Sequence, residues 1–186
     1  MTVFKDFPVE GVKAFACSGM PADCVRVGSL NVMPEKPDVV LSGINFGFNV
    51  ASDVQYSATV GAALEGAFQG CLGIAISEST ENCHEITDAY LRQLLAENIN
   101  TEPMKDQIIN INIPGGKVDE CKGIKRNLPT SNGSFYYDRY KLIEEKEDGT
   151  LVYEVDGIYN EECEKGTDFE AVVQKYISVG IVNNVK

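Results

Sequence analysis

The fold of this 186-residue chain is decided by residues 37–77, which read PDVVLSGINFGFNVASDVQYSATVGAALEGAFQGCLGIAIS. Their first part, DVVLSGIN (38–45), is a β-branched run typical of a short buried strand that leads into a loop. TVGAALEGAFQG (59–70) has apolar residues at helical spacing, including Phe68, and ends in a glycine suited to a helix C-cap. LGIAIS (72–77) is a second apolar strand, so this order predicts a parallel pair with a right-handed crossover.

The same alternation of strands and helices extends on both sides of this stretch. EITDAYLRQLLAENI (85–99) has the periodicity of an amphipathic helix, and IININIP (108–114) predicts a third strand that proline and glycine end. Ahead of the central stretch, PADCVRVGSL (21–30) predicts a short helix that opens with proline. Residues 1–116 therefore read as an α/β core with a mostly parallel sheet.

The character of the chain changes after residue 116. YYDRYKLIEEKEDGTLVYEVDG (136–157) has an Asp-Gly turn between two β-prone runs, which indicates a β-hairpin. We interpret this hairpin as a projecting arm that offers a surface to another subunit. KYISVGIV (175–182) predicts one more strand. Residues 117–186 are thus expected to form the arm and a C-terminal strand that returns to the core or to a partner subunit.

Composition excludes several classes of function. A net charge of −12 disfavours binding of a nucleic-acid polymer through a basic face. The sequence contains no run of about 18 apolar residues, so it predicts no membrane span. The acids and proline in residues 1–11 are unlike a signal peptide, so we expect a cytoplasmic protein. Six cysteines without a CxxC pair and a lone histidine, His84, disfavour a zinc site of common spacing.

The loop between the first strand and the helix at 59–70 is the best candidate for a ligand site. In an open parallel sheet, ligands bind beyond the carboxyl ends of the strands. Ser57 and Thr59 come at the start of the helix, where unpaired N–H groups and the helix dipole attract an anion such as phosphate. The alternative is that Ser57 or Thr59 only caps the helix. Asp53 is a nearby carboxylate, for which loop solvation or a turn is the simpler interpretation.

Other catalytic patterns are absent from the sequence. It contains no GxxxxGK[ST] phosphate loop and no GxSxG nucleophile elbow. Ser57 as the nucleophile of an unrelated hydrolase is a weaker hypothesis, because the single histidine, His84, lies in a polar stretch typical of the surface.

Four blocks of the chain resemble the SurE, or survival protein E, family. Residues 37–77 resemble its central signature, in which a strand and SGIN are followed by GxN and YSGTV. SGMPADCVRVGSL (18–30) is similar to the family's GTPADCV segment, and IININIP (108–114) is similar to its LN(I/V)N(I/V)P strand. KGTDFEAVVQKYISV (165–179) is similar to its GTD segment. The blocks come in the family's order and cover nearly the whole chain.

This resemblance implies a Rossmann-like three-layer α/β core with a swapped arm or C-terminal extension, assembled as homodimers or homotetramers. It also implies a phosphomonoesterase that hydrolyses nucleoside 5′- and 3′-monophosphates with a divalent cation, Mg²⁺ or Mn²⁺. Carried over by position, Asn45 of SGIN resembles a metal ligand, and an amide oxygen suits such a hard cation. Asn49, Ser57 and Thr59 match the family's substrate and phosphate positions.

Two departures from the family pattern bear on catalysis. The family's N-terminal NDDG, whose aspartates hold the metal, does not occur in this sequence, so the catalytic residues are unassigned. We expect that the natural gene product carries this strand, that the 186-residue chain has little or no activity, and that the missing central strand exposes a neighbouring strand edge. Ala58 replaces the family's glycine in YSGT. The alternative hypothesis is a catalytically impaired relative that acts as a binding or oligomerisation module.

Overall fold

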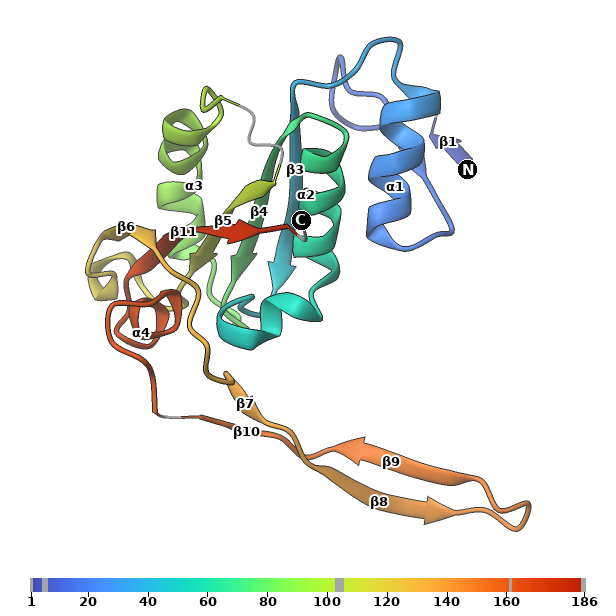
Figure 1. Cartoon of the computed structure of the whole chain (residues 1–186), viewed down its shortest axis with the longest axis vertical. Helices are drawn as coiled ribbons and strands as arrows, with labels where there is room; N and C mark the ends of the chain where they lie inside the picture. Colours follow the sequence, from blue (N-terminus) through green and yellow to red (C-terminus); the bar gives the residue numbers. More distant parts are fainter. Residues whose placement is uncertain (1, 5–6, 103–105, 161, 185–186) are drawn as a thin grey trace.

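The computed structural model describes residues 2–4, 7–102, 106–160 and 162–184. Within the N-terminal stretch 1–11, residues 1, 5 and 6 lie outside the described residues. A layered core carries a long hairpin arm that projects away from it (Figure 1). Among the helices of the described ranges, none combines the length and the apolar character that crossing a membrane requires.

The core is built on one five-stranded sheet in the order β3-β4-β5-β11-β6. Its strands are β3 (Val39–Phe46), β4 (Leu72–Glu78), β5 (Gln107–Ile113), β6 (Ile124–Leu128) and β11 (Ile177–Asn183). The first three pair in parallel, whereas β11 runs antiparallel to β5 and parallel to β6. The predicted α/β class with a mostly parallel sheet is therefore confirmed.

Helices cover both faces of this sheet, which makes three layers (Figure 1). Large residues of β4, such as Ile74, share a buried cluster with Ile86 and Leu94 of α3 (Glu85–Asn98). Ala75 of the same strand points the other way, into a cluster with Val60 of α2 (Ala58–Phe68). Alternation along a strand sends neighbouring side chains to opposite faces, so β4 is buried on both sides.

β3 is one of the two edge strands of the sheet, and its exposure overturns the prediction of a buried strand at residues 38–45. Its apolar side chains Leu41, Ile44 and Phe46 are 47%, 44% and 57% exposed. Within the described residues β3 pairs with β4 alone. The expectation of an exposed strand edge is thus confirmed. Phe68 is also exposed, although its spacing predicted a place on the apolar face of α2.

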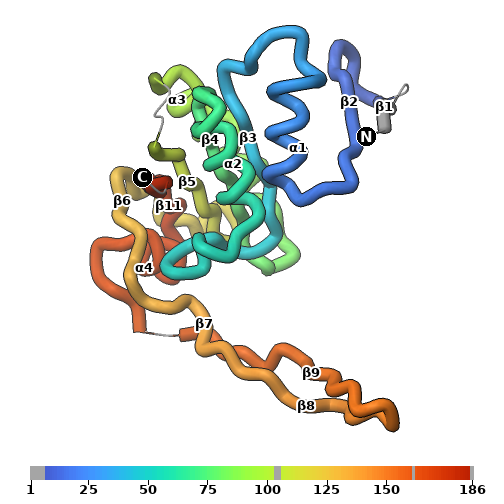
Figure 2. Tube along the Cα trace, turned by 45° about the vertical axis from the view of Figure 1, so that its right-hand side comes forward, coloured from blue at the N-terminus to red at the C-terminus, as the bar shows by residue number. Residues whose placement is uncertain are grey.

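The N-terminal residues lie beside α2, outside the main sheet. β1 (Thr2–Phe4) and β2 (Ala14–Ala16) form a separate antiparallel pair. They are followed by α1 (Pro21–Val27), which begins with the expected proline and continues into a π-helical turn at Gly28–Val32. Figure 2 shows α1 between this strand pair and α2.

The predicted hairpin arm is confirmed. Its root is the short pair β7 (Tyr136–Tyr137) and β10 (Ile158–Tyr159), and its distal part is β8 (Tyr140–Glu145) and β9 (Leu151–Val155). Phe135, next to the root, is buried and packs edge-on against Phe169 of α4 (Asp168–Val173), at 5.1 Å between ring centroids. This aromatic contact attaches the arm to the core, because edge-to-face rings attract each other.

Candidate functional site

The loop of residues 47–57 follows β3 and lies at the carboxyl edge of the sheet. Asn49 attaches it there through a buried hydrogen-bond network. Its backbone N–H donates to Asn112 Oδ1 at 2.8 Å, and its side-chain amide donates to Ser77 Oγ at 2.6 Å. Its carbonyl accepts from the side-chain amides of Asn110, at 2.8 Å, and Asn112, at 3.2 Å. The loop is therefore tied to the ends of both β4 and β5.

A buried carboxylate makes a second attachment of the same loop. Asp168, at the start of α4, accepts hydrogen bonds from the backbone N–H groups of Ala51 (3.2 Å), Ser131 (2.9 Å) and Phe169 (2.7 Å). Burial raises the pKa of Asp168, and these hydrogen bonds partly offset that rise because they favour the ionised form. The sequence block KGTDFEA contains this residue, but nothing in the pattern alone predicted that it holds the site loop.

The N-terminus of α2 follows the loop. Ser57 is its N-cap, and Ser57 Oγ accepts a hydrogen bond from the backbone N–H of Val60 at 3.0 Å. The capping alternative is therefore present in the structure. A hydroxyl that accepts here keeps its own hydrogen for a further acceptor. The first-turn N–H groups of Ala58 and Thr59 add the positive end of the helix dipole, so an anion is favoured at this point.

Asn45 occupies the carboxyl end of β3, in register with Ser77 of β4. Its side-chain amide donates to the Gly47 carbonyl at 2.8 Å, and this geometry leaves the amide oxygen as a possible metal ligand. A divalent cation needs several hard ligands. In the ranges that the structure describes, no group of three or more His, Cys, Asp or Glu side chains is placed to hold one. The described residues thus offer one amide oxygen, that of Asn45, and do not by themselves supply the set of ligands that a divalent cation needs.

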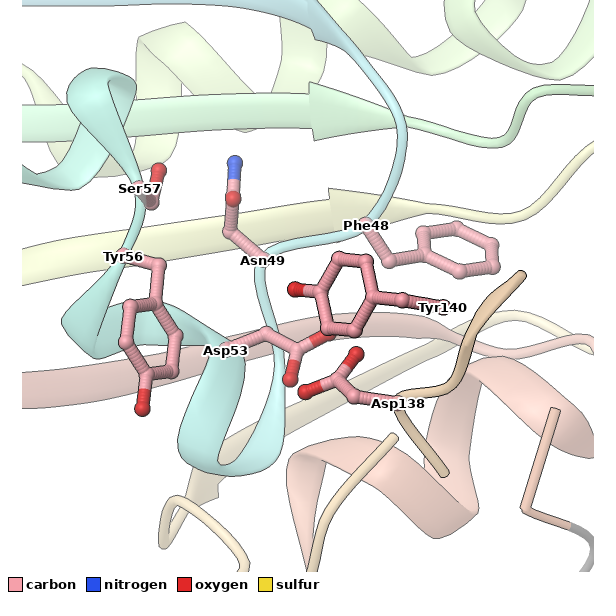
Figure 3. Close-up of a pocket in the computed structure, with 7 residues that line it drawn as sticks. All are labelled: Phe48, Asn49, Asp53, Tyr56, Ser57, Asp138 and Tyr140. Carbon is pink, nitrogen blue, oxygen red and sulfur yellow. The ribbon is translucent and has the colours of Figure 1, made fainter. Parts of the chain in front are cut away.

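A pocket of about 550 Å³ opens beside the loop (Figure 3). It is lined by Phe48, Asn49, Asp53, Tyr56, Ser57, Asp138 and Tyr140. Of the four site residues predicted from the sequence, this pocket brings Asn49 and Ser57 together. Asn45 and Thr59 lie outside its lining.

The pocket is acidic, and half of that charge comes from the arm. Asp53 and Asp138 face each other across it (Figure 3). Burial raises the pKa of Asp53 because it disfavours the charged form, and the nearby Asp138 carboxylate raises this pKa further because it repels a second negative charge. Sequence reasoning did not predict Asp138 or Tyr140, because they come from the hairpin, more than 80 positions after the loop in the chain. Only the fold brings the two segments together.

The fold and the loop define an α/β protein with a helix N-terminus and an attached pocket at the carboxyl edge of its sheet, the usual place of ligand sites in this class. Comparison with known proteins makes the assignment specific. Residues 1–137 match the family described as "Survival protein SurE". The chain therefore belongs to the SurE family.

Individual relatives agree with this assignment. The chain is 37% identical over 173 residues to 5′-nucleotidase SurE of Thermosipho melanesiensis, covering 91% of this chain and 67% of the relative. It is 33% identical over 189 residues to 5′-nucleotidase SurE of Clostridium botulinum, covering 96% of this chain and 74% of the relative. A crystal structure of the SurE protein from Aquifex aeolicus matches with a TM-score of 0.71 and 34% identity, covering 89% of this chain and 67% of that one.

Proposed function

We propose that this protein is a phosphomonoesterase that hydrolyses nucleoside 5′-monophosphates, and also 3′-monophosphates, to nucleoside and phosphate. The similarity to relatives named 5′-nucleotidase SurE supports this reaction class. The observation that carries the proposal is the anchored loop. It sets Ser57 and the first turn of α2 at the carboxyl edge of the sheet, beside a pocket large enough for a small ligand.

Binding of the phosphate group follows from the groups at this helix N-terminus. The hydroxyl of Ser57 and the N–H groups of Ala58 and Thr59 are donors for phosphate oxygens, and the helix dipole adds a favourable field. Asn49 acts on this site indirectly, because its buried hydrogen bonds hold the loop that precedes the helix. We therefore assign Asn49 as a positioning residue and Ser57 and Thr59 as phosphate-side residues.

We also propose dependence on a divalent cation, Mg²⁺ or Mn²⁺. Such an ion would neutralise phosphate charge and activate water when bound. Asn45 would supply one amide oxygen to it. Because the described residues provide no complete ligand set, no catalytic step is assigned to them.

The test is a phosphate-release assay of the natural gene product with AMP and 3′-AMP, with added Mn²⁺ and with a chelator. Ser57→Ala should mainly raise KM, because it removes a phosphate donor and weakens the cap. Ser52→Ala is the matched control, since Ser52 lies on the same loop outside the pocket lining. Asn45→Ala should raise the Mn²⁺ concentration needed for half-maximal rate. Turnover unaffected by both Ser57→Ala and Asn45→Ala would reject this site.

The same assay separates the proposal from its alternative. Nucleotide binding without phosphate release, with or without Mn²⁺, would favour a binding module over an enzyme. Calorimetric titration of AMP alongside the rate measurement distinguishes these outcomes.

We further propose that the arm makes contacts between identical subunits in a homodimer or homotetramer. β8 and β9 carry exposed apolar side chains, among them Leu142, Ile143, Tyr153 and Val155. Exposed apolar clusters of this kind mark protein interaction surfaces. Ile143→Glu should lower the oligomer mass measured by light scattering, and an unchanged mass would contradict the arm's role.

A further inference from the structure

The pocket beside the α2 N-terminus is built from two segments that are distant in the sequence. Phe48, Asn49 and Asp53 come from the loop after β3, whereas Asp138 and Tyr140 come from the arm, where β7 leads into β8. Figure 3 shows the Tyr140 ring and the Asp138 carboxylate reaching over the loop from the arm side. Its volume of about 550 Å³ falls in the range of roughly 300–1,000 Å³ typical of small-molecule sites. The arm is therefore part of a ligand pocket as well as a projection.

The chemistry of the pocket changes from one end to the other. At the helix end lies Ser57, whose surroundings favour an anion. The ring of Tyr56 lies beside Ser57, and the rings of Tyr140 and Phe48 lie further along the pocket (Figure 3). Tyr140 is 66% exposed, so its ring can still be covered by a flat ligand. Aromatic rings of this kind bind nucleobases by stacking, whatever the base.

The two carboxylates of the pocket select against a second anion. No lysine or arginine is among the seven lining residues, so Asp53 and Asp138 meet no cation there. Their proximity raises the pKa of Asp53, after the larger effect of burial. Carboxylates accept hydrogen bonds, and the hydroxyls of a sugar and the amino groups of a base are uncharged donors. A group that is flat, uncharged and rich in donors fits this end of the pocket.

We infer that this pocket is the nucleoside subsite of the enzyme, with Tyr140 stacking on the base and Asp53 and Asp138 accepting hydrogen bonds from the nucleoside's sugar or amino donors. The inference rests on the proposed phosphomonoesterase function only in placing the phosphate at Ser57. It assigns the arm residues a role in substrate specificity. An ester without a nucleoside would use the phosphate end alone.

The first experiment measures binding of adenosine by calorimetry, which needs neither phosphate nor turnover. Tyr140→Leu should weaken adenosine binding by about tenfold, the usual scale for loss of one stacking ring. Tyr140→Phe should retain binding because it keeps the ring. Tyr137→Leu is the matched control, since Tyr137 is comparably exposed on the same segment and does not line the pocket. Equal affinity of wild type and Tyr140→Leu, or no adenosine binding by wild type, would overturn the inference.

The second experiment identifies the donors that the acids bind. Asp138→Ala, which removes the acceptor, should weaken adenosine binding, whereas Asp156→Ala, an exposed arm control, should not. If the loss disappears with 2′,3′-dideoxyadenosine, the sugar hydroxyls are the partners. If the loss persists with that ligand and disappears with purine riboside, which lacks the amino group, the base is the partner. An Asp138→Ala variant with wild-type affinity for adenosine would contradict the assignment.

The third experiment separates this inference from the proposed function. Tyr140→Leu should raise KM for AMP and leave KM for p-nitrophenyl phosphate, an ester without a nucleoside, unchanged. Equal increases for both esters would count against a nucleoside subsite. If the natural gene product with added Mn²⁺ hydrolyses neither ester but its adenosine binding still depends on Tyr140, the proposed function fails and the subsite stands.

Discussion

The buried asparagines of β5 allow a sharp test of how the site loop is held. Asn110 and Asn112 lie two positions apart on the same face of β5, and both are almost fully buried. The side-chain oxygen of Asn112 accepts a hydrogen bond from the backbone N–H of Asn49, and its side-chain amide donates one to the Asn49 carbonyl. Asn110 donates only to that same carbonyl, and its own side-chain oxygen is buried without a partner among the described residues.

Truncation to alanine removes the same volume at both positions but leaves different polar groups behind. After Asn110→Ala, the carbonyl of Asn49 still accepts from Asn112, so its hydrogen bonding remains satisfied. After Asn112→Ala, the N–H of Asn49 loses its acceptor inside the protein. An unsatisfied buried donor costs about 1–3 kcal/mol. We therefore expect Asn112→Ala to lower the free energy of unfolding by about 1–3 kcal/mol more than Asn110→Ala.

Urea denaturation of the two variants beside wild type gives this difference directly, and equal slopes of the transitions would make the comparison valid. Hydrogen exchange of the Asn49 amide supplies a local readout, because only Asn112→Ala should speed it. A larger cost for Asn110→Ala, or unchanged exchange at Asn49 in Asn112→Ala, would refute the reasoning.

Three further predictions concern the site loop, the carboxylate that holds it, and helix α2. Folding raises the pKa of Asp53, so its ionisation destabilises the folded state as the pH rises through that pKa. Asp53→Asn should therefore be more stable than wild type above the pKa of Asp53 and no more stable in acid. Denaturation curves at several pH values check this, and a stability difference that does not change with pH would contradict it. Asp168→Ala should cost about 3–5 kcal/mol, measured by urea denaturation, because three backbone donors lose a buried acceptor. In α2, Gly61→Ala should stabilise by about 0.5–1 kcal/mol because a Cβ meets nothing there, whereas Gly66→Ala, whose Cβ would lie 2.7 Å from Val40 Cβ, should destabilise by about 1–3 kcal/mol. Opposite signs in paired thermal melts test the last prediction.

Local patterns predicted most of the elements correctly. The strands at 72–77, 108–114 and 175–182 and the helix at 85–99 appear within about two residues of their predicted bounds, as expected for such boundaries. The exposure of the apolar side chains of β3, in contrast, was not predicted by its local pattern. An apolar β-branched run has the same pattern whether one neighbouring strand or two lie beside it, so sequence periodicity alone predicted burial.

Some features of the candidate site were likewise predicted from local sequence, and others were not. Ser57 was predicted because a hydroxyl before a helical repeat is a local signal, and capping and anion binding both follow from that position. Asn49 was predicted by resemblance to a family motif, but its buried bonds to Ser77 and Asn112 were not, because hydrogen bonds between distant segments leave no mark on spacing.

The sequence by itself determined the family, the order of strands and helices, and the loop that faces the carboxyl edge, since these depend on motifs and on periods of two and 3.6 residues. The sequence predicted an exposed strand edge, but only the tertiary structure decided that β3 is the strand that carries it, that Asp168 holds Ala51, and that Tyr140 and Asp138 complete the pocket. These contacts join residues many positions apart. Their geometry depends on how whole elements pack, which no local stretch of the chain encodes.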